Sequence, residues 1–197
     1  MTGDLRRLSV EIDVGGIVRR SVASLYSQLV TRPTGRAVRL AIETQIAEFG
    51  EVAFSVIDLT EVTLLDFSCA DEVVAKLLQR YMRDDRPREA YFVFRGLADF
   101  HLDPIESVLE RQGLAAVAQG AGGAFELLGP RSSEEGAVWR LVEERGSLPG
   151  STLTDLIDTD HREALESLVG RRLVFRTASG DVHALSRLVQ DDDTLSP

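Results

Sequence analysis

The sequence predicts an α/β fold followed by a smaller α+β unit. Two short runs, Ala53–Leu59 and Ala90–Phe94, are nearly all apolar, which is typical of central parallel strands covered on both faces. Between these runs, apolar residues recur at helical spacing from Ala70 to Tyr81. After Gly129 the pattern changes to three short helical segments and a hairpin. Strands that alternate with helices indicate the α/β class for the first part of the chain.

The first elements follow from periodicity and turn residues. Leu8–Val14 alternates apolar and polar side chains, which indicates a half-buried strand, and Gly15-Gly16 supplies a turn. The stretch Ile17–Val30 fits either a second strand or a short helix. A breaker cluster at Thr31–Gly35 precedes a helix that extends to about Phe49. The apolar residues of that helix lie four apart, at Val38, Ile42 and Ile46.

The later elements of the first part follow from a helix cap and from glycines. Asp103 caps a helix, Pro104 takes its first position, Glu106 completes a capping box, and Gly113 ends it. Two short apolar runs surround a glycine-rich turn and are expected to be late or edge strands, at Leu114–Ala118 and Ala124–Leu128. The predicted order is therefore β-α-β-α-β-α-β.

The remaining third of the chain has the outline of a winged helix-turn-helix. One helix lies around residues 137–142, Ser151 caps a short second helix, and Asp160 caps a third, with Glu163 closing its box. Two strand-like runs, Arg172–Thr177 and Val182–Leu188, are separated by a hairpin turn. The expected organisation is a first domain at 5–129, a linker at 130–133, a winged-helix-like domain at 134–190 and a disordered tail at 191–197.

Composition excludes several classes of function. The 197 residues carry 22 basic and 32 acidic side chains, a net charge of −10, which argues against a large nucleic-acid footprint and against docking to anionic membranes. No apolar run approaches the roughly 20 residues of a membrane span, and the first residues lack the apolar core of a signal peptide. We therefore expect a cytoplasmic protein.

Neither a metal site nor a catalytic motif is evident. A single cysteine excludes an internal disulfide and a Cys-based zinc cluster, and the three histidines lie far apart in the chain. The sequence lacks a G-x-S-x-G elbow, an H-E-x-x-H motif and the glycine patterns that cradle phosphates. Cys69 is predicted to be a buried structural thiol rather than a redox centre. We expect no cofactor, no metal and no enzymatic activity.

The segment Val56–Leu78 carries the most information about function. Its strand ends Val56-Ile57-Asp58-Leu59, and Asp66 then opens the turn before the next helix. This pattern resembles the STAS family, the sulfate-transporter and anti-sigma-factor-antagonist domain. It is most similar to a STAS-like variant whose helix opens Ser-Phe-Ala-Asp-Glu, which stands here as Ser68–Glu72. Thr31–Arg39 resembles the Arg-containing start of the first helix in that variant, and the resemblance covers about Leu8–Gly129.

The resemblance implies a STAS-like mixed sheet with flanking helices and a bacterial signalling or scaffold protein that docks a protein partner. In the antagonist branch that partner is an anti-sigma-type ATPase or kinase, in a partner-switching pathway, and it phosphorylates a Ser or Thr beside the Asp. A phosphate adds about −1.5 to −2 charge at a helix N-terminus and so changes which partner fits. The partner-binding residues that the resemblance implies here are Asp66, Phe67, Ser68, Asp71 and Glu72.

This sequence departs from the family at the phospho-acceptor. The aligned position holds Phe67, which cannot accept phosphate. Ser68, one residue further, is a candidate acceptor, but we favour it as the N-cap of a Cys69–Tyr81 helix, a role that Ser often takes. Asp71 and Glu72 also suit a structural role, because acidic side chains in a first turn oppose the helix dipole favourably.

Two other functions are compatible with the sequence. The first alternative is a DNA-binding regulator with a STAS-like sensor, in which Arg162, Arg171, Arg172 and Arg176 contact nucleic acid. Residues 131–197 hold 8 basic and 13 acidic side chains, however, which favours a protein-docking or dimerising unit and leaves a homodimer open. The weaker alternative is a nucleotide or small-ligand sensor that uses the end of the sheet.

Overall fold

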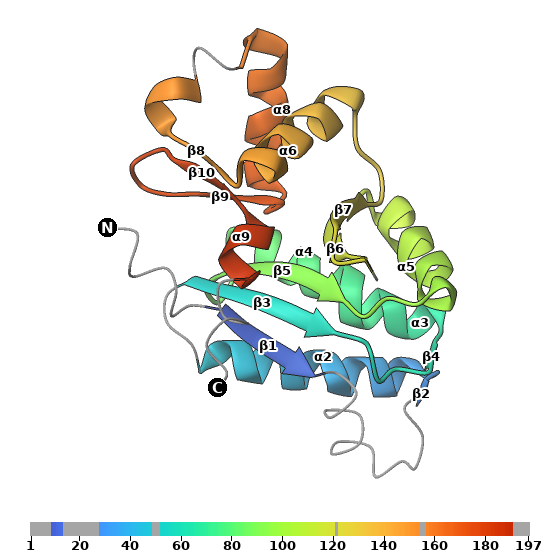
Figure 1. The fold of residues 1–197 in the computed structure, drawn as a ribbon. Helices are drawn as coiled ribbons and strands as arrows, with labels where there is room; N and C mark the ends of the chain where they lie inside the picture. The colour runs from blue at the N-terminus through green and yellow to red at the C-terminus, as the bar shows by residue number, and fades with distance from the viewer. Residues whose placement is uncertain (1–8, 14–27, 49–51, 121, 154–156, 191–197) are drawn as a thin grey trace.

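The computed structural model describes residues 9–13, 28–48, 52–120, 122–153 and 157–190. Within these residues a five-stranded sheet has the order β1-β3-β5-β6-β7 (Figure 1). The first four of these strands are mutually parallel, and β7 is antiparallel to β6. The α/β class is thereby confirmed. The strands are β1 (Ser9–Asp13), β3 (Val52–Asp58), β5 (Glu89–Arg95), β6 (Ala116–Gln119) and β7 (Phe125–Leu128).

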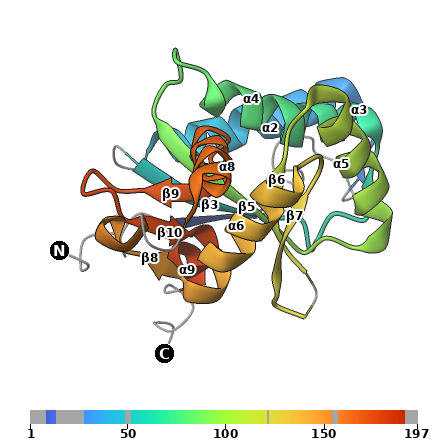
Figure 2. The same ribbon diagram turned by 90° about the horizontal axis from the view of Figure 1, so that it is seen from above.

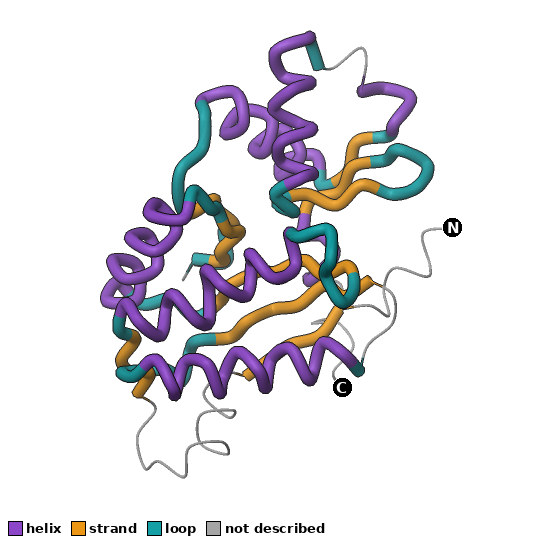
Figure 3. The backbone as a smooth tube through the Cα atoms, turned by 180° about the vertical axis from the view of Figure 1, so that it is seen from behind, coloured by secondary structure: helices purple, strands orange, loops and turns teal. Residues whose placement is uncertain are grey.

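Three helical segments cover one face of this sheet (Figure 3). They are α2 (Arg32–Ala47), the continuous run α3 (Phe67–Ala70), η2 (Asp71–Lys76) and α4 (Leu77–Met82), and α5 (Asp99–Gln112). Alternate strand residues such as Ile57, Phe92 and Ala118 are buried beneath the helices, because successive side chains of a strand point to opposite faces.

The opposite face is covered by the C-terminal part of the chain (Figure 2). Phe54 and Tyr91 of the sheet meet Phe175, with ring centroids 5.0 and 5.3 Å apart. β3 and β5 are therefore buried on both sides, which explains their continuous apolar runs. The covering elements are α6 (Ser133–Arg145), β8 (Ser147–Leu148), η3 (Gly150–Thr152), α8 (Thr159–Gly170), β9 (Val174–Arg176), β10 (Val182–Ala184) and α9 (Leu185–Gln190).

A small parallel pair lies beside the main sheet. β2 (Gln28–Leu29) pairs with β4 (Leu64–Leu65), so the end of the ambiguous stretch Ile17–Val30 is a strand. The predictions for Gly15-Gly16, for the rest of that stretch up to residue 27 and for the tail at 191–197 lie outside the described residues.

Besides Ser151, which lies inside η3 after the N-cap Pro149 and is not a cap as predicted, three predicted caps and one strand require correction. The helix after β4 is capped by Asp66 rather than Ser68, because the Asp66 N–H bonds to the Leu29 carbonyl and ends the β2–β4 pairing at that residue. The α8 helix is capped by Asp158, two residues before Asp160. The run predicted as a strand over Val182–Leu188 becomes helical at Leu185, where α9 begins.

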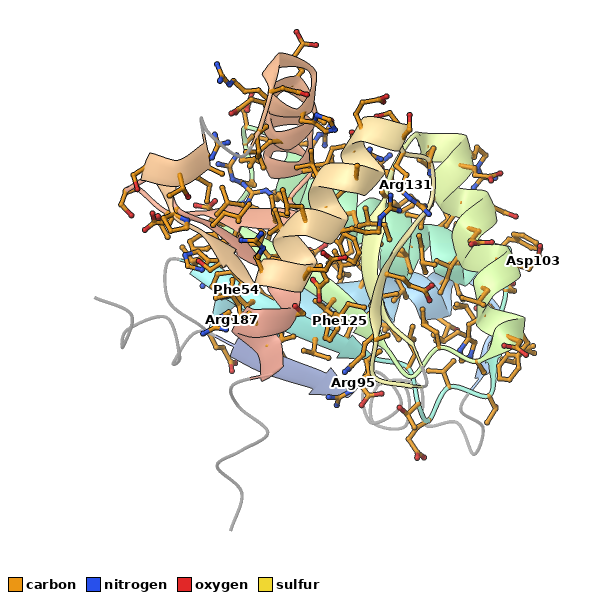
Figure 4. The ribbon with its side chains drawn as sticks, turned by 45° about the horizontal axis from the view of Figure 1, so that its top comes forward. Phe54, Arg95, Asp103, Phe125, Arg131 and Arg187 are labelled. Carbon is orange, nitrogen blue, oxygen red and sulfur yellow. The ribbon has the colours of Figure 1, made fainter. Side chains whose placement is uncertain are left out.

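The third corrected cap is that of α5, which begins four residues before Asp103. The imidazole of His101 accepts the Ala98 N–H through Nδ1 at 3.1 Å and closes the first turn. Asp103 is therefore an exposed residue inside the helix, and it projects outward in Figure 4. Pro104 also lies inside α5, and Gly113 ends the helix in the left-handed conformation, as predicted.

Candidate functional site

Asp66 organises the turn that carries the STAS-like pattern. Its Oδ1 accepts the Cys69 N–H at 2.8 Å and the Ser68 hydroxyl at 2.9 Å. The Ser68 hydroxyl is thus held by the capping carboxylate at the start of α3. A phosphate on Ser68 would lie beside that carboxylate and repel it.

Phe67 is the exposed member of the motif. Half of its surface, 50%, is open to solvent, and it lies in the first turn of α3 directly after β4. Phe100, 52% exposed, is in the first turn of α5, which packs against both β4 and α3. Val30 and Leu64, at the end of β2 and in β4, are exposed as well. We call these four side chains, Val30, Leu64, Phe67 and Phe100, the apolar end.

Asp71 and Glu72 lie beneath the surface, only 5% and 2% exposed. Arg32 Nη1 donates to Asp71 Oδ2 at 2.7 Å and to Glu72 Oε1 at 3.1 Å. This placement corrects the expectation that the two carboxylates contact a partner directly, because cations of the same chain already occupy them. The cluster is completed by Arg39, Lys76 and Arg111.

The ion-pair cluster, defined as Asp71 and Glu72 with Arg32, Arg39, Lys76 and Arg111, joins three helical segments. Burial by itself raises the pKa of both carboxyls. The hydrogen bond from Arg32 to Asp71, that from Lys76 to Glu72 and the surrounding positive charges outweigh burial, so both pKa values are lowered. Both groups are therefore ionised at neutral pH and connect η2 to α2 and α5.

Close contact between α2 and α3 accompanies this cluster. A Cβ on Gly35 would lie 2.9 Å from the Cα of Cys69, which is closer than a Cβ atom can approach without a shift of its neighbours. The two helices therefore come this close because position 35 is a glycine. Immediately after this contact, Asp71–Lys76 forms a π-helical turn, a feature frequent at functional sites. The amphipathic spacing of the sequence contains no signal for that turn.

Cys69 is a buried thiol whose Sγ donates to the Thr31 carbonyl at 3.0 Å. Burial, reinforced by the nearby Asp66 carboxylate, raises the pKa of the thiol to about 12. The predicted burial of the Cys69 thiol is confirmed, and a protonated and enclosed thiol is a poor nucleophile.

The carboxyl ends of the parallel strands hold the residues relevant to the small-ligand alternative. Arg95 Nη2 donates to Asp58 Oδ2 at 2.8 Å, and Asp58 Oδ1 accepts the Thr60 N–H at 2.8 Å. Burial raises the pKa of Asp58, but the Thr60 and Arg95 hydrogen bonds outweigh it and lower the value. Figure 4 shows Arg95 at this edge of the sheet. Both side chains already have protein partners there.

Most of the arginines proposed for DNA contact are engaged within the chain. Arg171 Nη1 lies 3.0 Å from each Glu135 carboxylate oxygen, and Arg176 forms two hydrogen bonds with Glu166, at 2.7 and 2.9 Å. Arg172 pairs with Glu89 at 3.3 Å, and its guanidinium lies 5.0 Å from the Tyr91 ring centroid. Arg162 is exposed at the start of α8.

Sequence reasoning missed the cations of the ion-pair cluster. Arg32 and Arg39 lie within the segment that resembles the Arg-containing helix start of the STAS-like variant, and that resemblance was the available signal. Lys76 and Arg111 had no such signal, because a basic side chain on a helix is ordinarily a solvated one.

Comparison of the chain with protein-family models, with curated proteins and with solved structures finds no match. Among the residues that the structure describes, no group of three or more His, Cys, Asp or Glu side chains is placed to hold a metal ion. None of the helices in that part of the chain has the length and apolar character needed to cross a membrane.

Proposed function

We propose that this chain is a non-enzymatic, bacterial-type signalling or scaffold protein whose STAS-like unit docks a protein partner through the apolar end. The observation that carries the proposal is the half-exposed Phe67 at the first turn of α3. A large ring left in water next to other exposed apolar side chains is typical of an interaction site, and Phe is enriched at interfaces.

The ion-pair cluster supports this function indirectly. It ties η2 to α2 and α5 through buried carboxylates, so the elements that carry Phe67 and Phe100 are held in fixed relation. A rigid surface loses less entropy on binding than a mobile one. Because Phe67 cannot be phosphorylated, docking at this position does not depend on a phosphate switch there.

The C-terminal part supplies a second interaction surface under this proposal. Its small sheet has the order β8-β10-β9, with α6 and α8 preceding the hairpin, which supports a winged-helix-like unit. Arg171, Arg172 and Arg176 are paired with carboxylates of the same chain, which favours protein docking over DNA binding. The resemblance to the antagonist branch makes an anti-sigma-type ATPase or kinase the partner to test first.

Matched variants test the docking surface. Phe67→Ser removes the central ring of the apolar end, and Leu40→Ser removes an exposed apolar side chain of α2 as a control. An ATPase or kinase of the anti-sigma type should bind the wild type and Leu40→Ser equally, and Phe67→Ser at least about tenfold more weakly by calorimetry, a loss typical of a buried interface anchor. Equal binding by all three chains would exclude the apolar end.

DNA binding is tested separately by titrating duplex DNA at low and at moderate salt. The proposal expects no binding above the weak non-specific level, since the protein is strongly acidic. Tight binding that weakens steeply with salt and is lost in Arg162→Gln would establish the regulator instead.

A further inference from the structure

A groove on the helical face of the molecule is not used by the proposed function. Its volume is about 770 Å³, and it lies between α2, the end of α4 and the end of α5. Figure 3 looks onto this helical layer. The groove is separated from Phe67 along the helical run, because its nearest lining residue there, Lys76, is nine helical residues further along, or roughly 14 Å at 1.5 Å per residue.

The titratable side chains that line the groove are all basic. They are Arg39 of α2, Lys76 of η2, and Arg80 and Arg83 at the end of α4, and the amides of Gln79 and Gln112 lie between them. Among the described residues, this concave surface is lined by four cations and by no carboxylate, although the chain as a whole has a net charge of −10. Its charge therefore points to an anionic ligand.

Two of these cations, Arg39 and Lys76, are bound by carboxylates of the same chain. Arg39 donates through Nε to Glu72 at 3.3 Å and through Nη1 to Glu43 at 2.6 Å, and Lys76 pairs with the buried Glu72. Among the described residues, the Nη2 group of Arg39 and at least one of the three N–H donors of Lys76 have no partner and can bind a ligand. The carboxylates thus fix the cations before a ligand arrives.

The other two cations differ, since Arg80 has a carboxylate partner and Arg83 has none among the described residues. Arg80 pairs with Asp85 at 3.6 Å and donates to its carbonyl through Nη1. The guanidinium of Arg83 makes no ion pair or hydrogen bond with any residue that the structure describes. Glu43, Glu72 and Asp85 offset the charges of Arg39, Lys76 and Arg80, and the carboxyl-terminal ends of α4 and α5 add about half a negative charge each. The sites for an anion are therefore the guanidinium of Arg83 and the N–H groups that the paired cations keep.

We propose that the groove binds an oligophosphate group, two or three linked phosphates, carried by a small molecule. Arg and Lys side chains are the usual protein ligands of phosphate, and several cations at one site suit a chain of phosphates better than a single one. The volume lies within the range of small-molecule sites. The groove residues that the structure describes include no aromatic ring, so a nucleobase adds little to binding.

Calorimetry on the full chain at low ionic strength tests this site. Sodium tripolyphosphate and ATP should bind with affinities within about threefold of each other, and orthophosphate about tenfold or more weakly, because fewer charges are paired. A marked preference for ATP would overturn the assignment to the phosphate chain. A tri-glutamate peptide that binds as tightly as tripolyphosphate would overturn the assignment to phosphate.

The matched variants change charge equally at two places. Arg80→Gln with Arg83→Gln alters the groove, and Arg140→Gln with Arg145→Gln alters exposed arginines of α6. The groove pair should weaken tripolyphosphate binding at least about tenfold and the α6 pair less than about twofold, because direct charge pairing is lost at the groove alone. If the double groove variant unfolds, the single variant Arg83→Gln replaces it in the test, because Arg83 is exposed and its change should not affect folding. No binding by the wild type, or an equal loss in both pairs, would overturn the site.

Discussion

At the scale of single residues, the structure holds a few polar groups whose burial has measurable consequences. Ser55, His101 and Glu72 are almost fully enclosed, yet their surroundings differ. Among the described residues, Ser55 has no hydrogen-bond partner for its hydroxyl. His101 uses both ring nitrogens, and Glu72 is paired with several cations. The effect of replacing each follows from whether its polar atoms are satisfied.

Ser55→Ala is expected to raise the free energy of unfolding by about 1 kcal/mol, because an unpaired buried hydroxyl costs about 1–3 kcal/mol. Urea unfolding of wild type and variant measures the change. Ser68→Ala is the control, since its hydroxyl bonds to Asp66 and its loss should not stabilise the protein. Destabilisation by Ser55→Ala would show that the hydroxyl does have a partner in solution.

His101 makes the stability of the protein depend on pH. Its Nε2 donates to the Val62 carbonyl at 2.9 Å, while Nδ1 accepts the Ala98 N–H, so the neutral ring fits the site. Burial lowers the pKa of His101, and the Val62 hydrogen bond opposes this only in part. The unfolded chain therefore takes up a proton below about pH 6.5 that the folded chain does not, and stability falls as pH decreases from there.

The measurement is urea unfolding at several pH values between about 7.5 and 5.5, around the ordinary His pKa. Burial also lowers the pKa of His183, so part of the pH dependence remains without His101. His101→Asn should therefore show a shallower decline of stability with acid than the wild type. An unchanged slope would rule out His101 as its source.

At the scale of elements, the contacts between α2, α3 and η2 position the surface proposed to dock a partner. Gly35 brings α2 against Cys69, and the ion-pair cluster joins α2, η2 and α5. A steric contact and an electrostatic one thus act on the same pair of helices. The two contacts are adjacent, since a Cβ on Gly35 would also lie 3.1 Å from the Cβ of Glu72.

Gly35→Ala should lower the free energy of unfolding by about 1–3 kcal/mol, since the new methyl group would overlap the Cα of Cys69. The matched control is Gly170→Ala at the end of α8, where nothing lies within 4 Å of the added Cβ. That control should be neutral or stabilising by about 0.5–1 kcal/mol, because Ala favours helix over Gly. Thermal or urea unfolding of both variants measures the contrast, and equal effects would refute the close contact.

Glu72→Gln should destabilise the protein by about 3 kcal/mol, because it removes one side of a buried ion pair. Glu43→Gln, which changes a more exposed partner of Arg39, should cost about 1 kcal/mol or less. The lowered pKa of Glu72 adds stability above its unfolded value of about 4.3, and this is lost as pH falls further. The variant should therefore unfold with less dependence on pH in that acidic range; a full wild-type dependence would contradict this assignment.

At the scale of the whole molecule, each face of the sheet belongs to a hydrophobic core of its own, and the second core is shared with the C-terminal part. Phe54, Tyr91, Val93 and Val117 on the sheet are buried together with Trp139, Leu168 and Phe175 of the C-terminal part. Without that part, a large apolar face of the sheet would be exposed to water. The division into two domains, at 129–134 by sequence, stays a prediction that unfolding experiments can test.

Unfolding should therefore be a single cooperative transition. Trp139, the only tryptophan, reports on the C-terminal part through its fluorescence, whereas far-UV circular dichroism reports on all helices and strands. Because the two parts share apolar contacts, the two probes should give the same urea midpoint. A tryptophan transition at clearly lower urea would instead show that the C-terminal part unfolds as a separate unit.

The sequence predicted elements well and side-chain environments poorly. Apolar runs and 3.6-residue periodicity located β3, β5 and the Phe67–Met82 helix, because both signals are local. Caps were less secure. Several Asp and Ser residues stand near each helix start, and at Asp66 the pairing of β4 with β2 decided among them. His101 likewise closes the first turn of α5 by accepting the Ala98 N–H. Its other ring nitrogen bonds to the Val62 carbonyl, so its orientation depends on where α5 meets that loop.

By itself, the sequence determined the α/β class, the net charge of −10, the burial of the single cysteine and the presence, at position 67, of a Phe that cannot accept phosphate. Only the tertiary structure decided that Asp71 and Glu72 are enclosed by cations, that basic side chains of α2, η2 and α4 line one groove, and that the C-terminal part covers the sheet. The first set rests on residue identity and on contacts within a few positions of the chain. The second set depends on contacts between residues about 30 to 120 positions apart in the sequence. No local sequence pattern specifies that such residues come together in space.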